Sequence, residues 1–145
     1  MSWRERLRRN PSNAEIQVYE ELQRQKMYEY ERDWVLVIDD FQGVMAFRKE
    51  QVTFSVIKNR KFGLPDFLAE KKRKPVYLDG EKVHGTPTRS RKDAVFRTAL
   101  TVNGWEPLLI VYNGRELPAY KLKLIVDEMR LFLDGVVEEI KEART

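Results

Sequence analysis

The chain contains no cysteine, a single histidine and no long apolar run. The absence of cysteine excludes disulfides, thiolate metal sites and a cysteine nucleophile, and it suits a reducing compartment. No stretch approaches the roughly 18 consecutive apolar residues that a membrane span needs, and the arginine-rich N-terminus lacks the apolar core of a signal peptide. We therefore expect a cytoplasmic protein that does not insert into a membrane.

Internal repeats, low-complexity tracts, a phosphate-binding glycine loop and a nucleophile motif are also absent from the sequence. A small-molecule enzyme is for this reason the least favoured class. With 145 residues, of which 42% are hydrophobic, the chain has the size of a single domain spanning residues 1–145. The 27 basic side chains exceed the 23 acidic ones, and this balance weakly favours a polyanionic partner.

A helix is predicted from about residue 13 to residue 25. Ser12 and Glu15 have the spacing of a capping box, and apolar residues follow at helical intervals. Glu15 therefore has a structural explanation as a carboxylate in the first turn. The preceding ten residues carry four arginines, and they are either a solvated terminus or an arm that contacts phosphates.

The segment 28–59 is expected to be a β-rich insertion. Residues 34–38 are apolar and β-branched, residues 39–43 resemble a turn, and residues 44–47 and 52–57 are candidates for further strands. The basic residues 58–61 that follow are interpreted as a solvated turn.

A β-hairpin is predicted next. Two apolar runs, 64–69 and 75–78, flank a charged connection, and the second strand is expected to end at Asp79 and Gly80. This geometry brings Asp66, Asp79 and His84 near one another.

The rest of the chain completes an α/β pattern. A helix around 94–102 ends at Asn103 and Gly104, a strand within 105–112 is expected to be buried on both faces, and a long helix runs from 119 to about 141 with a kink or break at Gly135. We expect an α/β fold in which a mixed central sheet is flanked by helices.

Two carboxylates and one histidine at a strand edge have the chemistry of a Mg²⁺ site, because hard oxygen ligands suit this ion. A metal-activated water would then attack a phosphodiester. The alternative is structural: Pro-Asp and Asp-Gly are common turn dipeptides, and a lone histidine is often structural.

At these residues the chain resembles the very-short-patch-repair branch of the PD-(D/E)XK nucleases, which includes the EDxHD homing endonucleases. The resemblance covers residues 12 to about 113, apart from 28–59. It rests on Pro65-Asp66-Phe67, Asp79-Gly80-x-x-x-His84-Gly85, Arg91-Lys92-Asp93 and Leu100-x-x-x-Gly104-Trp105. It implies a restriction-endonuclease-like core.

The resemblance also implies roles for individual residues. Asp66, the backbone carbonyl of Leu78 and Asp79 would bind Mg²⁺, for which Mn²⁺ can substitute, and Glu15 would organise the site. His84 would act as general acid or base, oriented by Asp93 at the beginning of the next helix. The chain departs from the family in lacking the usual lysine, since Lys82 is one position late, and in carrying Asp79 where the repair enzymes have a histidine.

The expected function is a Mg²⁺-dependent DNA endonuclease, and the alternative is a nuclease-fold DNA-binding or assembly module that does not cleave. DNA is the expected partner, and a homodimer is left open. Two basic runs are predicted to contact phosphates. They consist of Lys71, Lys72, Arg73 and Lys74, and of Arg89, Arg91 and Lys92.

Overall fold

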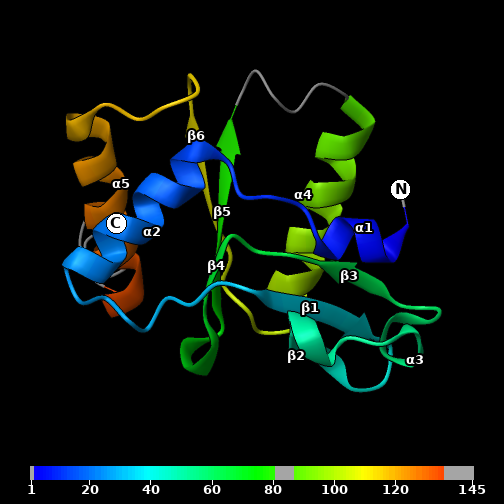
Figure 1. Ribbon diagram of the computed structural model, residues 1–145. Helices are drawn as coiled ribbons and strands as arrows, with labels where there is room; N and C mark the ends of the chain where they lie inside the picture. Colours follow the sequence, from blue (N-terminus) through cyan, green and yellow to red (C-terminus); the bar gives the residue numbers. More distant parts are fainter. Residues whose placement is uncertain (1, 81–86, 136–145) are drawn as a thin grey trace.

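Two small sheets and five α-helices make up the described part of the chain, which in this computed structural model comprises residues 2–80 and 87–135 (Figure 1). The helices are α1 (Trp3–Leu7), α2 (Asn13–Arg24), α3 (Phe54–Ile57), α4 (Pro87–Val102) and α5 (Ala119–Asp134). Two 3₁₀ turns, η1 (Lys49–Gln51) and η2 (Glu70–Lys72), accompany them.

The first sheet is entirely antiparallel, with the strand order β2-β1-β3. Its strands are β1 (Trp34–Asp39), β2 (Gly43–Arg48) and β3 (Lys61–Gly63). The second sheet has the order β4-β5-β6 and is mixed, because β5 pairs antiparallel with β4 and parallel with β6. Its strands are β4 (Phe67–Ala69), β5 (Lys74–Gly80) and β6 (Leu108–Tyr112).

Strand β5 separates two layers of the core. Successive side chains of a strand point to opposite faces of its sheet. Val76 and Leu78 belong to the hydrophobic cluster formed with α2 and α5, whereas Tyr77 packs with Phe96 and Leu100 of α4. Figure 1 shows α2 and α5 on one side of β5 and α4 on the other. The α/β pattern is confirmed, and helices flank the mixed β4-β5-β6 sheet. The expectation of one central sheet is wrong, because β1, β2 and β3 form a separate antiparallel sheet.

The first sheet packs beside the second through α4. Leu36 of β1, Leu68 of β4 and Leu100 of α4 are completely buried in one cluster. The strands predicted at 34–38 and 44–47 are confirmed, and so is the helix predicted at 13–25. None of the described helices has the length and apolar composition that crossing a membrane requires.

The strand predicted at 52–57 is wrong. A strand would place Val52 and Phe54 on the same face, yet Val52 is buried and Phe54 is 58% exposed. The chain instead forms the single helical turn α3, which directs Ile57 into the core. The third strand is β3, which begins at Lys61 at the end of the supposed solvated turn.

The expectation that residues 105–112 are buried on both faces is also wrong. β6 lies at the edge of its sheet and pairs only with β5 among the described strands. Ile110 is buried, but Leu109 is 37% exposed and Val111 is 50% exposed. An apolar run indicates that a strand tends to be buried. It does not indicate whether a helix or a second sheet covers both faces of that strand.

The break expected at Gly135 is confirmed as the end of α5. Gly135 adopts the left-handed conformation at the C-cap, with φ of 74°, which glycine accepts without steric cost. The prediction that the helix continues to about residue 141 concerns residues after 135, which lie outside the described part of the chain.

Candidate nucleic-acid cleft and acidic site

Asp66 is held at the entry of β4 by backbone contacts to β5. Its amide donates to the carbonyl of Val76 (3.0 Å), and its Oδ2 accepts a hydrogen bond from the amide of Leu78 (2.6 Å). Pro65 precedes it and favours extended backbone at Leu64, the residue before the proline. The carboxyl group is therefore fixed beside the β5 backbone.

Glu15 reaches the same position from α2. Ser12 caps this helix as predicted, because its Oγ accepts from the amide of Glu15 (3.2 Å). The Glu15 carboxyl lies close enough to Asp66 to raise the pKa of that residue. The first turn of α2 thus brings a second acid to the start of β4.

This acidic pair changes the protonation of Asp66. Burial raises the pKa of Asp66 well above its ordinary value, and the neighbouring Glu15 raises it further. The hydrogen bond from the Leu78 amide and the charge of Arg9 act in the opposite direction. Burial and the second acid outweigh these two effects, so the pKa of Asp66 is raised well above its ordinary value.

Leu78 and Asp79 complete the set of expected ligands. Within a strand the N–H and C=O of one residue point to the same side, so the Leu78 carbonyl faces the same edge as the amide that binds Asp66. Asp79 is the next residue of β5 and lines the cleft described below. It lies within the strand rather than in a turn, since β5 continues to Gly80.

The structure therefore brings Glu15, Asp66, Leu78 and Asp79 to one end of β5. His84 lies outside the described residues, so its pairing with Asp93 stays a prediction. Asp93 lines the cleft. It does not begin the helix as expected, because α4 starts at Pro87 and places Asp93 in its second turn.

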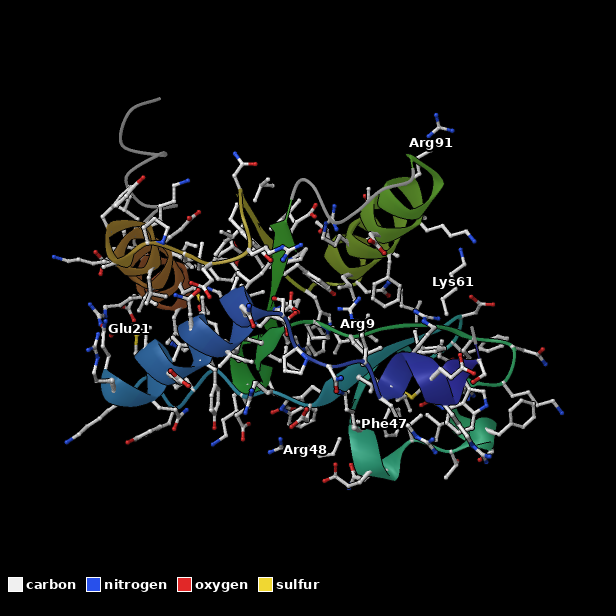
Figure 2. The ribbon with its side chains drawn as sticks, turned by 45° about the horizontal axis from the view of Figure 1, so that its top comes forward. Arg9, Glu21, Phe47, Arg48, Lys61 and Arg91 are labelled. Atoms are coloured by element: carbon white, nitrogen blue, oxygen red, sulfur yellow. The ribbon has the colours of Figure 1, made fainter. Side chains whose placement is uncertain are left out.

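A cleft of about 990 Å³ opens beside this acidic site. Its floor includes Asp66, Tyr77 and Leu78, and α4 contributes one wall. Seven basic side chains line it. They are Arg6, Arg9, Arg60, Lys61, Arg91, Lys92 and Arg97. Figure 2 shows that Arg9, Lys61 and Arg91 come from three separate segments.

Two of these cations, Arg6 and Arg9, belong to the arginine-rich N-terminus. The sequence alone did not decide whether this segment is a solvated terminus or an arm that contacts phosphates. Trp3 and Leu7 of α1 pack against the hydrophobic cluster beneath the first sheet. Arg6 donates to the carbonyl of Phe62 (3.2 Å), and its guanidinium carbon lies 4.0 Å from the centroid of the Phe62 ring. The segment is folded onto β3, and it carries Arg9 to the cleft.

Tyr77 is a cleft residue that sequence reasoning did not identify. The guanidinium carbon of Arg97 lies 5.8 Å from its ring centroid, and burial raises the pKa of its hydroxyl. Tyr77 and Asp79 share a face of β5, because they are two positions apart. Side chains alternate between the two faces of a strand, so a strand over residues 75–80 would have predicted that Tyr77 and Asp79 lie on the same face.

The basic hairpin turn 71–74 lies away from the cleft, and none of its residues lines it. The ammonium group of Lys72 donates to the carbonyl of Leu133 (3.1 Å), and that of Lys74 donates to the carbonyl of Phe132 (2.6 Å). Both lysines thus satisfy carbonyls at the C-terminal end of α5, where cations are favoured. Contact of this turn with DNA stays a prediction. Of the second basic run, Arg91 and Lys92 line the cleft, and the Arg89 side chain is outside the described part.

Within residues 2–80 and 87–135, no group of three or more histidine, cysteine or acidic side chains is arranged to hold a metal ion. Comparison with protein-family models, with curated proteins and with solved structures finds no match for the chain.

Proposed function

We propose that the protein is a Mg²⁺-dependent endodeoxyribonuclease with a restriction-endonuclease-like core. The observation that carries this proposal is Asp66, which the Leu78 amide holds at the floor of a cleft lined with cations, with Glu15 beside it. Acids alone at that position would repel a phosphodiester, whereas the surrounding arginines and lysines attract one.

The donor set suits a hard divalent cation. Asp66, the Leu78 carbonyl and Asp79 would hold Mg²⁺ or Mn²⁺, with Glu15 adjacent, because these ions prefer oxygen ligands and keep several waters. A cation bound there would have to displace a proton wherever Asp66 is protonated, since burial raises the pKa of this residue and ligating carboxylates are deprotonated. A metal bound there would supply a water of lowered pKa and would neutralise charge on the phosphate.

The cleft cations position the substrate. Arg6 and Arg9 approach from the N-terminal arm, and Arg91 and Lys92 approach from α4, so the backbone of a bound nucleic acid contacts basic groups from two elements. Such contacts release counterions and make binding weaken as salt rises.

Proton transfer is assigned to His84 and Asp93 in this proposal. Imidazole titrates near pH 6.5 and exchanges protons at neutral pH, and a carboxylate partner fixes its tautomer. Asp93 lies at the cleft, where it can serve as this partner. A cytoplasmic location and a homodimer remain further parts of the proposal.

Nicking of supercoiled plasmid tests the activity. The wild type should convert supercoiled plasmid to the open circle with Mg²⁺ and not with EDTA, and Asp66→Asn should abolish this conversion. Asp40→Asn is the matched control, because Asp40 is an exposed acid that does not line the cleft. Equal nicking by the wild type and Asp66→Asn would contradict the proposed site.

A second candidate is a DNA-binding or assembly module of the same fold without cleavage. It is favoured by the absence of a three-ligand cluster among the described residues and by the missing superfamily lysine. A protein that binds DNA with a steep salt dependence but never nicks plasmid with Mg²⁺ or Mn²⁺ would be this module.

A further inference from the structure

The exposed face of β6 continues the floor of the cleft. In the parallel pairing of β5 with β6, Tyr77 is opposite Leu109 and Asp79 is opposite Val111. These four side chains share one face of the sheet, because residues two apart along a strand point the same way. The acidic site and the apolar residues of β6 are therefore direct neighbours.

Helix α4 covers only part of this face. It packs over Tyr77 through Phe96 and Leu100, but it leaves Leu109 37% exposed and Val111 50% exposed. Val95 of α4 is 56% exposed and lines the cleft together with Leu109. We call Val95, Leu109 and Val111 the apolar shelf.

The shelf adjoins strongly cationic surroundings. Arg91 and Lys92 precede Val95 on α4, and Arg9 lies at the same cleft from the N-terminal side. A ligand that fits must carry negative charge along one side and apolar surface along the other. A phosphate chain with exposed bases has both properties.

Duplex DNA matches this surface poorly. Its phosphates face outward, but its base faces are covered by stacking and offer nothing to an apolar shelf. Proteins that bind single strands combine a positively charged groove with aromatic side chains on which the bases stack. Here exposed aliphatic side chains would provide the apolar contact for the base faces instead. Tyr77 lies beside Leu109 beneath α4, so the surface that the shelf offers to bases is aliphatic.

We propose that the cleft binds a single-stranded segment of DNA, with its phosphates on the basic side chains and its bases on the apolar shelf. This inference rests on the proposed function and specifies its substrate class. The bond to be cleaved would accordingly lie in, or next to, an unpaired segment rather than within an intact duplex.

Fluorescence anisotropy with a labelled oligonucleotide in EDTA tests binding apart from cleavage. The wild type should bind a single-stranded 12-mer about tenfold more tightly than a duplex of the same length, because only the single strand can bury apolar base surface on the shelf. Leu109→Ser, Val111→Ser and Val95→Ser should each remove most of this preference. The slope of log affinity against log salt should stay unchanged, because no cation is lost.

Two substitutions serve as matched controls. Val102 is 80% exposed and Tyr120 is 65% exposed, and neither lines the cleft, so Val102→Ser and Tyr120→Ser should retain the preference for the single strand. Thermal unfolding establishes that each variant is folded. We expect each to fold, because the substituted side chains are partly or largely exposed.

Equal affinity of the wild type for single strand and duplex would overturn the inference. Shelf variants that behave like the two controls would overturn it as well. Failure of the proposed cleavage is a separate result: it would appear as an absence of Mg²⁺-dependent nicking by a protein whose single-strand preference and shelf dependence are intact.

Discussion

Replacing Asp66 with Asn should make the protein more stable at neutral pH, although it removes the proposed activity. Asn keeps the size of the side chain, and its Oδ1 can accept the hydrogen bond that the Leu78 amide now donates to Asp66. The substitution removes an ionisable group that burial and Glu15 disfavour in its charged form. Functional sites commonly carry such a cost in stability.

The magnitude of the effect follows from proton linkage. Asp66 has a raised pKa in the folded state, so its contribution to stability is complete below the unfolded pKa of about 4 and is lost as pH rises toward the folded pKa. Within that window the wild type loses up to about 1.4 kcal/mol of stability per pH unit relative to Asp66→Asn. The advantage of the variant therefore grows with pH and disappears in acid.

Urea denaturation at a series of pH values measures this difference. Asp40→Asn controls for the loss of a negative charge, because Asp40 is exposed, and it should show no comparable trend. A difference between wild type and Asp66→Asn that is constant from pH 4 to pH 8, or that favours the wild type as pH rises, would refute the reasoning.

Three further substitutions test the cap of α2, the packing of β3 against α4 and the contact of Arg9 with DNA. Ser12→Ala should lower the free energy of unfolding by about 1 kcal/mol in urea titrations, because it removes the cap of α2; an unchanged value would exclude that cap. Gly63→Ala should cost roughly 1–3 kcal/mol in the same assay, since a Cβ there would meet the Phe96 ring at 2.8 Å, and a neutral effect would mean that β3 and α4 are not packed as described. Arg9→Ala should reduce the slope of log DNA affinity against log salt by about 1, and a wild-type slope would remove Arg9 from the interface.

The elements with strong local signals were predictable from the sequence. Ser12 and the apolar spacing after it placed α2, the charged connection between two apolar runs placed the β4–β5 hairpin, and Gly135 marked the end of α5. Each signal depends on backbone chemistry within a few residues, so the tertiary structure does not override it.

The elements that depend on distant packing were not predictable in the same way. The run 52–57 is apolar in either conformation, and only contact with the first sheet selects the helical turn α3. The exposure of Leu109 reflects the incomplete cover that α4 gives to β6. A sequence pattern carries no information on how far a neighbouring layer extends.

The sequence predicted that Asp66 and Asp79 lie near each other, and the hairpin explains this prediction. Glu15 and the Leu78 carbonyl came only from the family resemblance, and the role of all four residues in a site stays a prediction. The positions of the basic side chains were harder to predict. Lys72 and Lys74 donate to carbonyls of α5, whereas Arg6 and Arg9 of the N-terminal segment line the cleft. Only the tertiary fold distinguishes a lysine that caps a helix from an arginine that lines a cleft.

The central claim is that the Asp66 site exchanges a proton for a divalent cation, and calorimetric titration with Mn²⁺ tests it most directly. At a pH below the raised pKa of Asp66, binding of Mn²⁺ to the wild type should release a proton, which appears as a heat that varies with the ionisation enthalpy of the buffer. Asp66→Asn should show neither the binding nor the proton release, and Asp40→Asn should show both. Binding of Mn²⁺ to Asp66→Asn with wild-type affinity, or binding to the wild type without proton release, would contradict the account.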